Sequence, residues 1–236
     1  MTVKRIFLLI FLTAATFVTT RSQAVPQPIL LYERNNANYE EMLAILDSTA
    51  LSVFGHPGSK CVIVVHGKVG DVERDLELEQ VARRYFVSRA GPQLKDRWKF
   101  VRARQTEKRM VRAWLIPAGA QMPQIDEAEW SFRYPEGTKP FIIEDCGYSP
   151  EWEPEPCSYV DRINILAQLL KAEPEARTNI VLRVRSRTEF AKRKRKILAN
   201  LRKTYDIGSN QVRFFQVIAR PDPDRIESTV QYWFVP

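Results

Sequence analysis

The sequence is poor in histidine, cysteine and glycine, and this scarcity excludes several kinds of functional site. The chain of 236 residues has two histidines, three cysteines and nine glycines. His56 and His66 lie in different predicted elements and give no metal-ligand spacing, so we predict no metal site. Gly67 and Gly70 follow a predicted strand, but the Lys-Ser/Thr ending of a phosphate-binding loop is missing. We therefore expect no metal, no other cofactor and no enzymatic activity.

Long apolar runs are also absent after the N-terminus, so no later membrane span is predicted. Lys4 and Arg5 precede an apolar stretch at residues 6–18, which is too short for a stable transmembrane helix. Small side chains before the expected cleavage point predict cleavage after Ala24. We interpret residues 1–24 as a signal peptide, with an uncleaved N-terminal anchor as the alternative. The mature chain is then extracytoplasmic, either periplasmic or secreted.

Positive charge is only in modest excess once the signal peptide is removed. The mature chain has 33 Lys and Arg against 28 Asp and Glu, so its net charge is +5, compared with +8 for the whole chain. This excess supports solubility more than it indicates a particular polyanion, and we expect no nucleic-acid partner. Hydrophobic residues make up 44% of the chain, which is ample for a packed core.

The two halves of the chain match when they are aligned at an offset of 119 residues. Near their C-terminal ends this offset aligns three pairs: Val111 with Val230, Trp114 with Trp233, and Pro117 with Pro236. It also places the apolar residues 62–65 over residues 181–184. Because the same order of elements recurs in both halves, we predict two copies of one structural unit.

Each copy is predicted to fold as strand, helix, strand, helix, strand, strand. Apolar residues three and four apart indicate the helices, and β-branched and aromatic runs indicate the strands. The elements of the first copy are residues 29–33, 39–54, 61–66, 72–90, 98–104 and 109–117. Those of the second copy are residues 141–145, 160–172, 179–185, 188–205, 211–219 and 228–235. The predicted fold is α/β in the α+β sense, with two tandem units that each have a mixed sheet with helices on one face.

Composition sets the predicted domain boundaries. Residues 25–120 form the first unit, residues 121–139 an acidic, proline-containing linker, and residues 140–236 the second unit with an insertion at 146–157. Nine acidic residues lie between Gln121 and Cys157. They either lie against the basic helix of the second unit and orient the two units, or keep the loop soluble. Aromatic residues in this region either stack on sugars or a partner, or pack onto a unit: Trp130, Phe132, Tyr134, Tyr148 and Trp152.

The three cysteines are predicted to have structural roles. Cys146 and Cys157 flank the insertion of an exported chain, and we predict a disulfide that ties this loop. Cys61 opens an apolar strand and is predicted to be a buried thiol. A nucleophilic Cys61 would need His56 or His66 as a base, and nothing supplies the third group that would orient that base.

The element order, with the segments VIVVHGKVGD and VARRYFVSRAG, resembles the OmpA-like family, the peptidoglycan-binding domain of outer-membrane protein A. The similarity covers the strand end and loop at residues 65–70 and the helix end at residues 82–91, where Tyr85, Phe86 and Gly91 stand at the expected places. The resemblance implies a bacterial envelope protein in which two degenerate copies of this domain follow each other.

The positions that bind peptidoglycan in that family differ here. The family's aspartate and arginine fall on Gly70 and Leu78 in the first copy, and neither side chain makes a charged hydrogen bond. In the second copy they fall on Glu189 and Arg193, whose spacing suggests an i,i+4 pair on one helix face. We therefore expect a non-catalytic interaction or scaffold protein of the envelope that contacts another envelope protein. The alternative is binding of peptidoglycan or another anionic cell-wall polymer through the second copy, and a remote third alternative is an enzyme of unknown type.

The strongest charge feature is the run of five cations at residues 192–196. Together with the residues before it, this run supplies the candidate binding residues Arg185, Arg187, Glu189, Lys192, Arg193 and Lys196. The apolar stripe of the same helix predicts that Leu198 and Leu201 are buried, with Lys194 as the most covered cation and Arg193 and Lys196 open to solvent. The run is either a contact surface for an anionic partner or a face that is solvated or covered within the chain.

Overall fold

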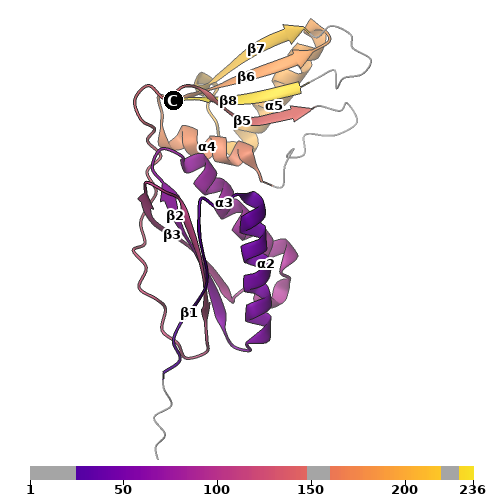
Figure 1. Ribbon diagram of the computed structural model, residues 1–236. Coiled ribbons are helices and arrows are strands. Elements are labelled where there is room, and N and C mark those ends of the chain that lie inside the picture. The colour runs from indigo at the N-terminus through magenta and orange to yellow at the C-terminus, as the bar shows by residue number, and fades with distance from the viewer. Residues whose placement is uncertain (1–24, 148–159, 219–228) are drawn as a thin grey trace, which may run out of the picture.

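The chain has an α+β fold with two four-stranded mixed sheets and four α-helices in the residues that its computed structural model describes, which are 25–147, 160–218 and 229–236 (Figure 1). The predicted signal peptide at residues 1–24 lies outside the described residues, as does most of the predicted insertion at 146–157. None of the helices in the described part of the chain is both long and apolar enough to cross a membrane.

The first unit follows the predicted order of elements, with two short extra turns after its second helix. Its elements are β1 (Ile29–Asn35), α2 (Tyr39–Gly55), β2 (Lys60–Lys68), α3 (Val72–Arg84), η1 (Tyr85–Arg89), η2 (Pro92–Leu94), β3 (Trp98–Thr106) and β4 (Met110–Ile116). Helix α2 begins after a capping box, in which the Asn38 and Glu41 side chains accept hydrogen bonds from each other's backbone N–H groups. The second predicted helix, at residues 72–90, is α-helical only to Arg84 and continues as the π-helical turn η1.

The second unit repeats this order. Its elements are β5 (Phe141–Gly147), α4 (Arg162–Ala172), β6 (Arg177–Val184), α5 (Arg187–Tyr205), η3 (Ser209–Gln211), β7 (Val212–Ile218) and β8 (Thr229–Val235). Helix α4 begins two residues later than predicted, because Asp161 caps it by accepting a hydrogen bond from the backbone N–H of Asn164.

The two sheets have the same topology. The strand order is β1-β4-β2-β3 in the first sheet, called sheet A here, and β5-β8-β6-β7 in the second, called sheet B. Only the last pair of each, β2 with β3 and β6 with β7, is parallel, whereas the other pairs are antiparallel. The helices lie on one face of each sheet, and we call the opposite face the outer face. The predicted mixed sheet with helices on one face is thus confirmed in both units.

Strand pairing confirms the predicted equivalence of Trp114 and Trp233. Trp114 pairs with Leu30 on one side and Val62 on the other, while Trp233 pairs with Ile142 and Asn179. Val62 therefore corresponds to Asn179 rather than to Val181, so the sequence alignment of the central strands was two residues out. Because side chains alternate along a strand, a shift of two residues leaves each side chain on its correct face.

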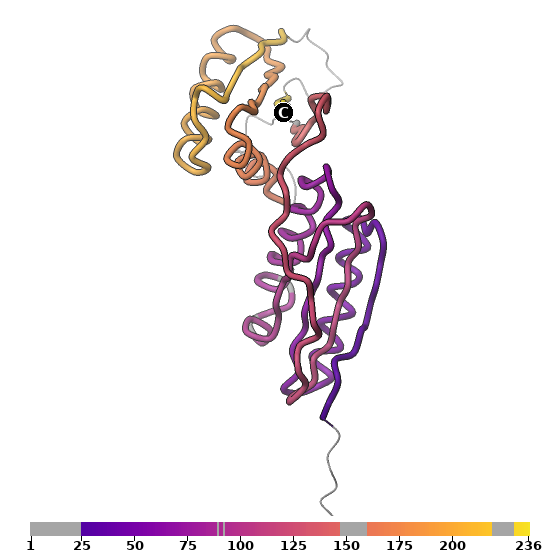
Figure 2. Tube along the Cα trace, turned by 90° about the vertical axis from the view of Figure 1, so that its left-hand side faces the viewer, coloured from indigo at the N-terminus to yellow at the C-terminus, as the bar shows by residue number. Residues whose placement is uncertain are grey.

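The connection between β4 and β5 is not a free linker, because it runs the length of sheet A and packs on it (Figure 2). Its residues 120–131, called the covering segment here, pass over the outer face and round the edge of β3. Ala120 and Ile125 pack on the apolar outer face of sheet A, and Trp130 is buried on the helix side, where its Nε1 donates to the Ala103 carbonyl at 3.0 Å. Packing onto a unit, rather than stacking on a ligand, is therefore the observed role of Trp130.

Acidic residues of the covering segment pair with the first unit rather than with the basic helix of the second. Glu127 binds Lys99 at 2.8 Å and Asp126 binds Arg104 at 3.0 Å. The proposed contact between these acids and α5 is therefore wrong. The acids at residues 151–155 lie outside the described residues, and so do Tyr148 and Trp152.

The two units meet where α3 packs against α4 (Figure 1). The Gln80 side chain makes two hydrogen bonds with the backbone of Asp161, at 3.0 and 3.1 Å, and Glu77 forms an ion pair with Arg162 at 2.8 Å. Tyr134 in the connection packs on the aromatic rings of Phe141 and Phe234. One continuous apolar core spans both units, so they form a single packed body.

Candidate functional site

The basic helix α5 is fixed at its N-terminus by Glu189, one of the predicted site residues. Ser186 caps the helix by accepting a hydrogen bond from the Glu189 backbone N–H at 3.1 Å. The Glu189 carboxylate in turn accepts a hydrogen bond from the Arg185 backbone N–H at 2.7 Å. These contacts hold the first turn of the helix, so Glu189 has a capping role.

The predicted pairing of Glu189 with Arg193 is confirmed. Their side chains form an ion pair one turn apart, and the Arg193 side chain is only 9% exposed. The prediction that Arg193 is open to solvent is therefore wrong. Position 193 lies three residues after Phe190 and four before Ile197, both of which pack against the core, so it faces the sheet. Arg193 therefore does not contribute to an exposed surface that a partner could contact.

Lys194, predicted to be the most covered of the five cations, is exposed instead. Its Nζ atom lies 5.5 Å from the centre of the Phe214 ring, so the side chain reaches over β7 at the flank of the helix. Leu201 is buried as predicted, whereas Leu198 is only half-buried. The side of α5 that packs against the core therefore includes position 193 instead of the predicted position 194.

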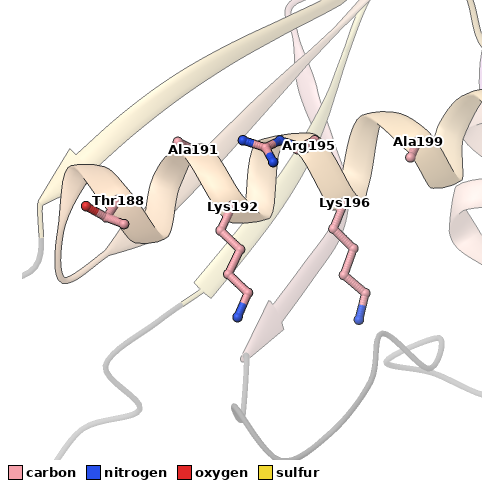
Figure 3. Close-up of a pocket in the computed structure, with 6 residues that line it drawn as sticks. All are labelled: Thr188, Ala191, Lys192, Arg195, Lys196 and Ala199. Carbon is pink, nitrogen blue, oxygen red and sulfur yellow. The ribbon is translucent and has the colours of Figure 1, made fainter.

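The exposed side of α5 gathers three cations around small side chains. An open pocket of about 440 Å³ is lined there by Thr188, Ala191, Lys192, Arg195, Lys196 and Ala199. Lys192 and Lys196, one turn apart, extend side by side in the same direction, and Arg195 leaves the helix on another side (Figure 3). Lys192 and Lys196 were predicted site residues, and Arg195 takes the place that Arg193 had in that prediction. We call Lys192, Arg195 and Lys196 the cationic face.

Arg185 precedes α5 and Arg187 is its first residue, and neither is among the residues that line the pocket. Both are exposed, and Arg185 contributes its backbone N–H to the Glu189 carboxylate. The six predicted site residues therefore divide into a capping residue, a buried partner and four exposed cations, of which Arg185 precedes the helix and the other three lie on it.

The two positions of the first unit that correspond to the family's ligand residues have structural roles. Gly70 adopts a positive φ of +74° in the turn before α3, where a Cβ atom would lie 3.2 Å from Pro135. Leu78 is fully buried in the core. The first unit thus offers no charged side chain at either position, as predicted.

A buried cluster of charges at the start of α3 was missed by the sequence interpretation. Arg109, between β3 and β4, binds Asp75 at 2.5 Å and Asp71 at 2.9 Å. The other Asp75 carboxylate oxygen accepts the Lys68 backbone N–H at 2.8 Å. Gly67 lies so close that a Cβ atom there would come within 2.5 Å of Asp75. The cluster ties the β2–α3 loop to the β3–β4 turn, so its role is structural.

Burial changes the acidity of groups in and beside this cluster. Burial raises the pKa of Asp75 to about 6, although the neighbouring Arg109 acts in the opposite direction. Burial also raises the pKa of Glu73 to about 7, while the hydrogen bond donated by the Tyr134 hydroxyl lowers it. The Tyr134 hydroxyl of the connection bonds Glu73, whereas Asp75 is bonded by Arg109 and the Lys68 backbone N–H.

The two cysteines that the structure describes, Cys61 and Cys146, lie in buried positions. Cys61 is buried as predicted, and burial raises the pKa of its thiol to about 12, which disfavours the thiolate form. Cys146 is buried in β5, but its predicted disulfide partner Cys157 lies outside the described residues, so that bridge stays a prediction.

The chain was compared with protein-family models, with curated proteins and with solved structures. None of these comparisons found a match. The cationic face of α5, where three exposed cations line an open pocket, is the candidate functional site.

Proposed function

We propose that the protein is a non-catalytic interaction or scaffold protein of the bacterial envelope, and that the cationic face of α5 contacts an acidic partner protein there. The observation that carries the proposal is the separation of charges on α5. Arg193 is neutralised by Glu189 on the buried side, whereas Lys192, Arg195 and Lys196 are exposed around small residues. Among the described residues that line this pocket, the other side chains are the small Thr188, Ala191 and Ala199, so the long cationic side chains extend beyond them toward an acidic surface.

Location outside the cytoplasm is part of this proposal and is supported by the sequence of residues 1–24. The structural roles of Gly70, Leu78, Glu189 and Arg193 argue against ligand binding in the manner of OmpA-like domains. A scaffold role therefore accounts for the chain better than recognition of the peptidoglycan stem peptide.

The proposal is tested with poly-L-glutamate as an acidic probe. Lys192, Arg195 and Lys196 are changed together to glutamine, and probe binding is measured by fluorescence anisotropy at several salt concentrations. We expect the triple variant to bind about tenfold more weakly, because each exposed charge contributes roughly 0.5 kcal/mol or more. The melting temperature should stay nearly unchanged, since these side chains are exposed.

A matched variant controls for the loss of net charge. Lys60, Lys95 and Lys108 are exposed cations of the first unit, and their replacement by glutamine should leave probe binding almost unaffected. Equal weakening by both triple variants would show that net charge alone attracts the probe, which contradicts a localised site.

Binding of an anionic cell-wall polymer is the second candidate, and the same cationic face favours it. Retention on purified peptidoglycan sacculi separates the two, because charge-driven binding weakens steeply with ionic strength. Salt-resistant retention that is lost in Arg193→Ala would support stem-peptide recognition and overturn the scaffold proposal.

A further inference from the structure

The outer faces of the two sheets carry apolar side chains at equivalent positions. Val62 pairs with Lys99 in sheet A, and Asn179 pairs with Arg213 in sheet B, so β3 and β7 correspond residue by residue. On this basis Phe215 and Val217 of β7 occupy the places of Val101 and Ala103 of β3, while Trp233 and Val235 occupy those of Trp114 and Ile116. Sheet B thus keeps most of the apolar outer face of sheet A, although Asn179 stands in the place of Val62.

The exposure of these matched residues differs sharply between the units. Val101 and Ala103 are 2% and 0% exposed, whereas Phe215 and Val217 are 47% and 45% exposed. The neighbouring Ile218 is 54% exposed, but its side chain lies on the other face of the strand, so Phe215 and Val217 form the outer-face row. A row of large apolar side chains along one edge strand is unusual for a surface that stays in water.

The covering segment shows how this fold closes its outer face. In sheet A the backbone N–H of Arg104 donates to the Asp126 carbonyl at 3.1 Å, and the N–H of Ala128 donates to the Arg102 carbonyl at 3.0 Å. These bonds make an antiparallel bridge between Ala103 and Glu127 at the edge of β3. Ile125 then lies on the apolar outer face. The segment therefore acts as a short additional strand.

The matching edge of sheet B is available to a strand. Among the described residues, β6 is the only strand that pairs with β7. By correspondence with β3, the backbone N–H of Ile218 and the carbonyl of Gln216 point away from β6, in the places of the Arg104 N–H and the Arg102 carbonyl. A partner strand would meet the same hydrogen-bonding pattern there.

Charge indicates what kind of strand fits this edge. Arg213 stands in the place of Lys99, which binds Glu127 of the covering segment at 2.8 Å. Arg183, also exposed, lies on the same outer face, in the place of His66. An extended segment that alternates acidic and apolar residues complements both the cations and the apolar row.

We propose that β7 and the outer face of sheet B bind an extended acidic segment of a partner protein, which adds antiparallel to β7 as the covering segment adds to β3. This surface is separate from the cationic face, because α5 lies on the opposite side of sheet B. The inference goes beyond the proposed function and holds or fails independently of it.

The covering segment itself supplies the probe for the test. A fluorescent peptide with the sequence of residues 119–131 is titrated with the full mature chain, and anisotropy is recorded. We expect saturable binding that Val217→Glu weakens at least tenfold, because a carboxylate there repels the acidic probe and interrupts the apolar row. Val87→Glu, an identical change at a valine that is 78% exposed on the first unit, should leave binding unchanged.

A change in the probe keeps the test independent of how well the variants fold. A peptide with Ala128→Pro lacks the N–H group that bonds the β3 carbonyl in the covering segment, so its binding should also fall at least tenfold. The cationic-face triple variant should bind the original peptide as the unchanged chain does. Absence of saturable binding, or equal binding of both peptides, would overturn the proposal. A dimer that Val217→Glu dissociates in sedimentation experiments would also overturn it, since a second copy would then occupy the face.

Discussion

The two units share one topology but differ in how their outer faces are covered and where their charges lie. The first buries its outer face under its own chain and gathers buried charges at the start of α3. The second leaves matched apolar residues of β7 exposed and places cations along the outer side of α5. Within the described residues, the first unit thus covers its apolar outer face with its own chain, whereas the second exposes apolar side chains of β7 and cations of α5. Predictions of stability therefore concern mainly the first unit, and predictions of binding concern the second.

The largest loss of stability should follow removal of one partner of the buried charge cluster. Asp75→Ala leaves the Arg109 guanidinium, which is 7% exposed, without its closest carboxylate. We expect the free energy of unfolding to fall by about 3 to 5 kcal/mol. Urea unfolding followed by circular dichroism measures this. The double variant Asp75→Leu with Arg109→Met should lose much less stability, because no charge is left unpaired. An equally large loss of stability in the double variant would contradict this explanation.

Removing the anchor of the covering segment should make the first unit resemble the second. Trp130→Ala deletes a ring that is 3% exposed, its hydrogen bond to the Ala103 carbonyl, and its edge contact with Phe100. The expected cost is about 3 kcal/mol. Binding of a hydrophobic dye at low urea should rise, since the apolar outer face of sheet A becomes accessible. The outcome that contradicts this is a normal unfolding midpoint with no added dye binding.

Glu73 should give the first unit a measurable pH dependence. Its pKa is raised to about 7 in the folded chain, so between about pH 4.5 and 7 the folded state holds a proton that the unfolded state releases. Stability is then highest below about pH 4.5, falls by at most about 1.4 kcal/mol per pH unit as the pH rises toward 7, and levels off above 7, where the group is ionised in both states. Glu73→Gln keeps an acceptor for the Tyr134 hydroxyl and should remove this part of the slope, leaving the smaller part from Asp75. An unchanged slope in thermal melts from pH 5 to 8 would refute the assignment.

The smallest effect concerns a cation and an aromatic ring that occur in both units. Arg83 lies 5.7 Å from the Phe100 ring centre, and Lys194 lies 5.5 Å from the ring centre of Phe214, the matching residue of β7. Lys194→Gln should lower the free energy of unfolding by about 0.5 kcal/mol. The neighbouring Lys192→Gln serves as the control, because Lys192 lines the open pocket and should cost nothing measurable. A larger loss of unfolding free energy in Lys194→Gln than in Lys192→Gln would support the cation–π contact. Equal losses in the two variants would contradict it.

The element order and most boundaries could be predicted because hydrophobic periodicity is local. The equivalence of Trp114 and Trp233 was also predictable, since the two C-terminal strands share the offset of 119. The central strands were aligned two residues out because both contain a run of apolar residues, at 61–65 and 180–182, and a shift of two residues preserves the alternation of faces. Only pairing with the neighbouring strands, which sequence alone does not show, fixes Val62 opposite Trp114.

The site was harder to predict because it depends on contacts between distant residues. The spacing of Glu189 and Arg193 was sufficient to predict their pairing, but not that the pair faces inward, since positions 193 and 194 both border the apolar stripe. Arg109 and Asp75 are 34 residues apart, and no local pattern joins them. A signal was present, because Asp75 lies between Val72 and Leu78 at helical spacing on the buried side of α3.

Amide hydrogen exchange at the two matched strand edges tests the central claim, that sheet A is closed and sheet B is open, most directly. In the free protein the Arg104 N–H is bonded to the Asp126 carbonyl, whereas the Ile218 N–H, at the equivalent position of β7, points outward. The account predicts slow exchange at Arg104 and fast exchange at Ile218 under the same native conditions. Equally slow exchange at both amides would contradict it, because the outer edge of β7 would then be closed already within the free chain.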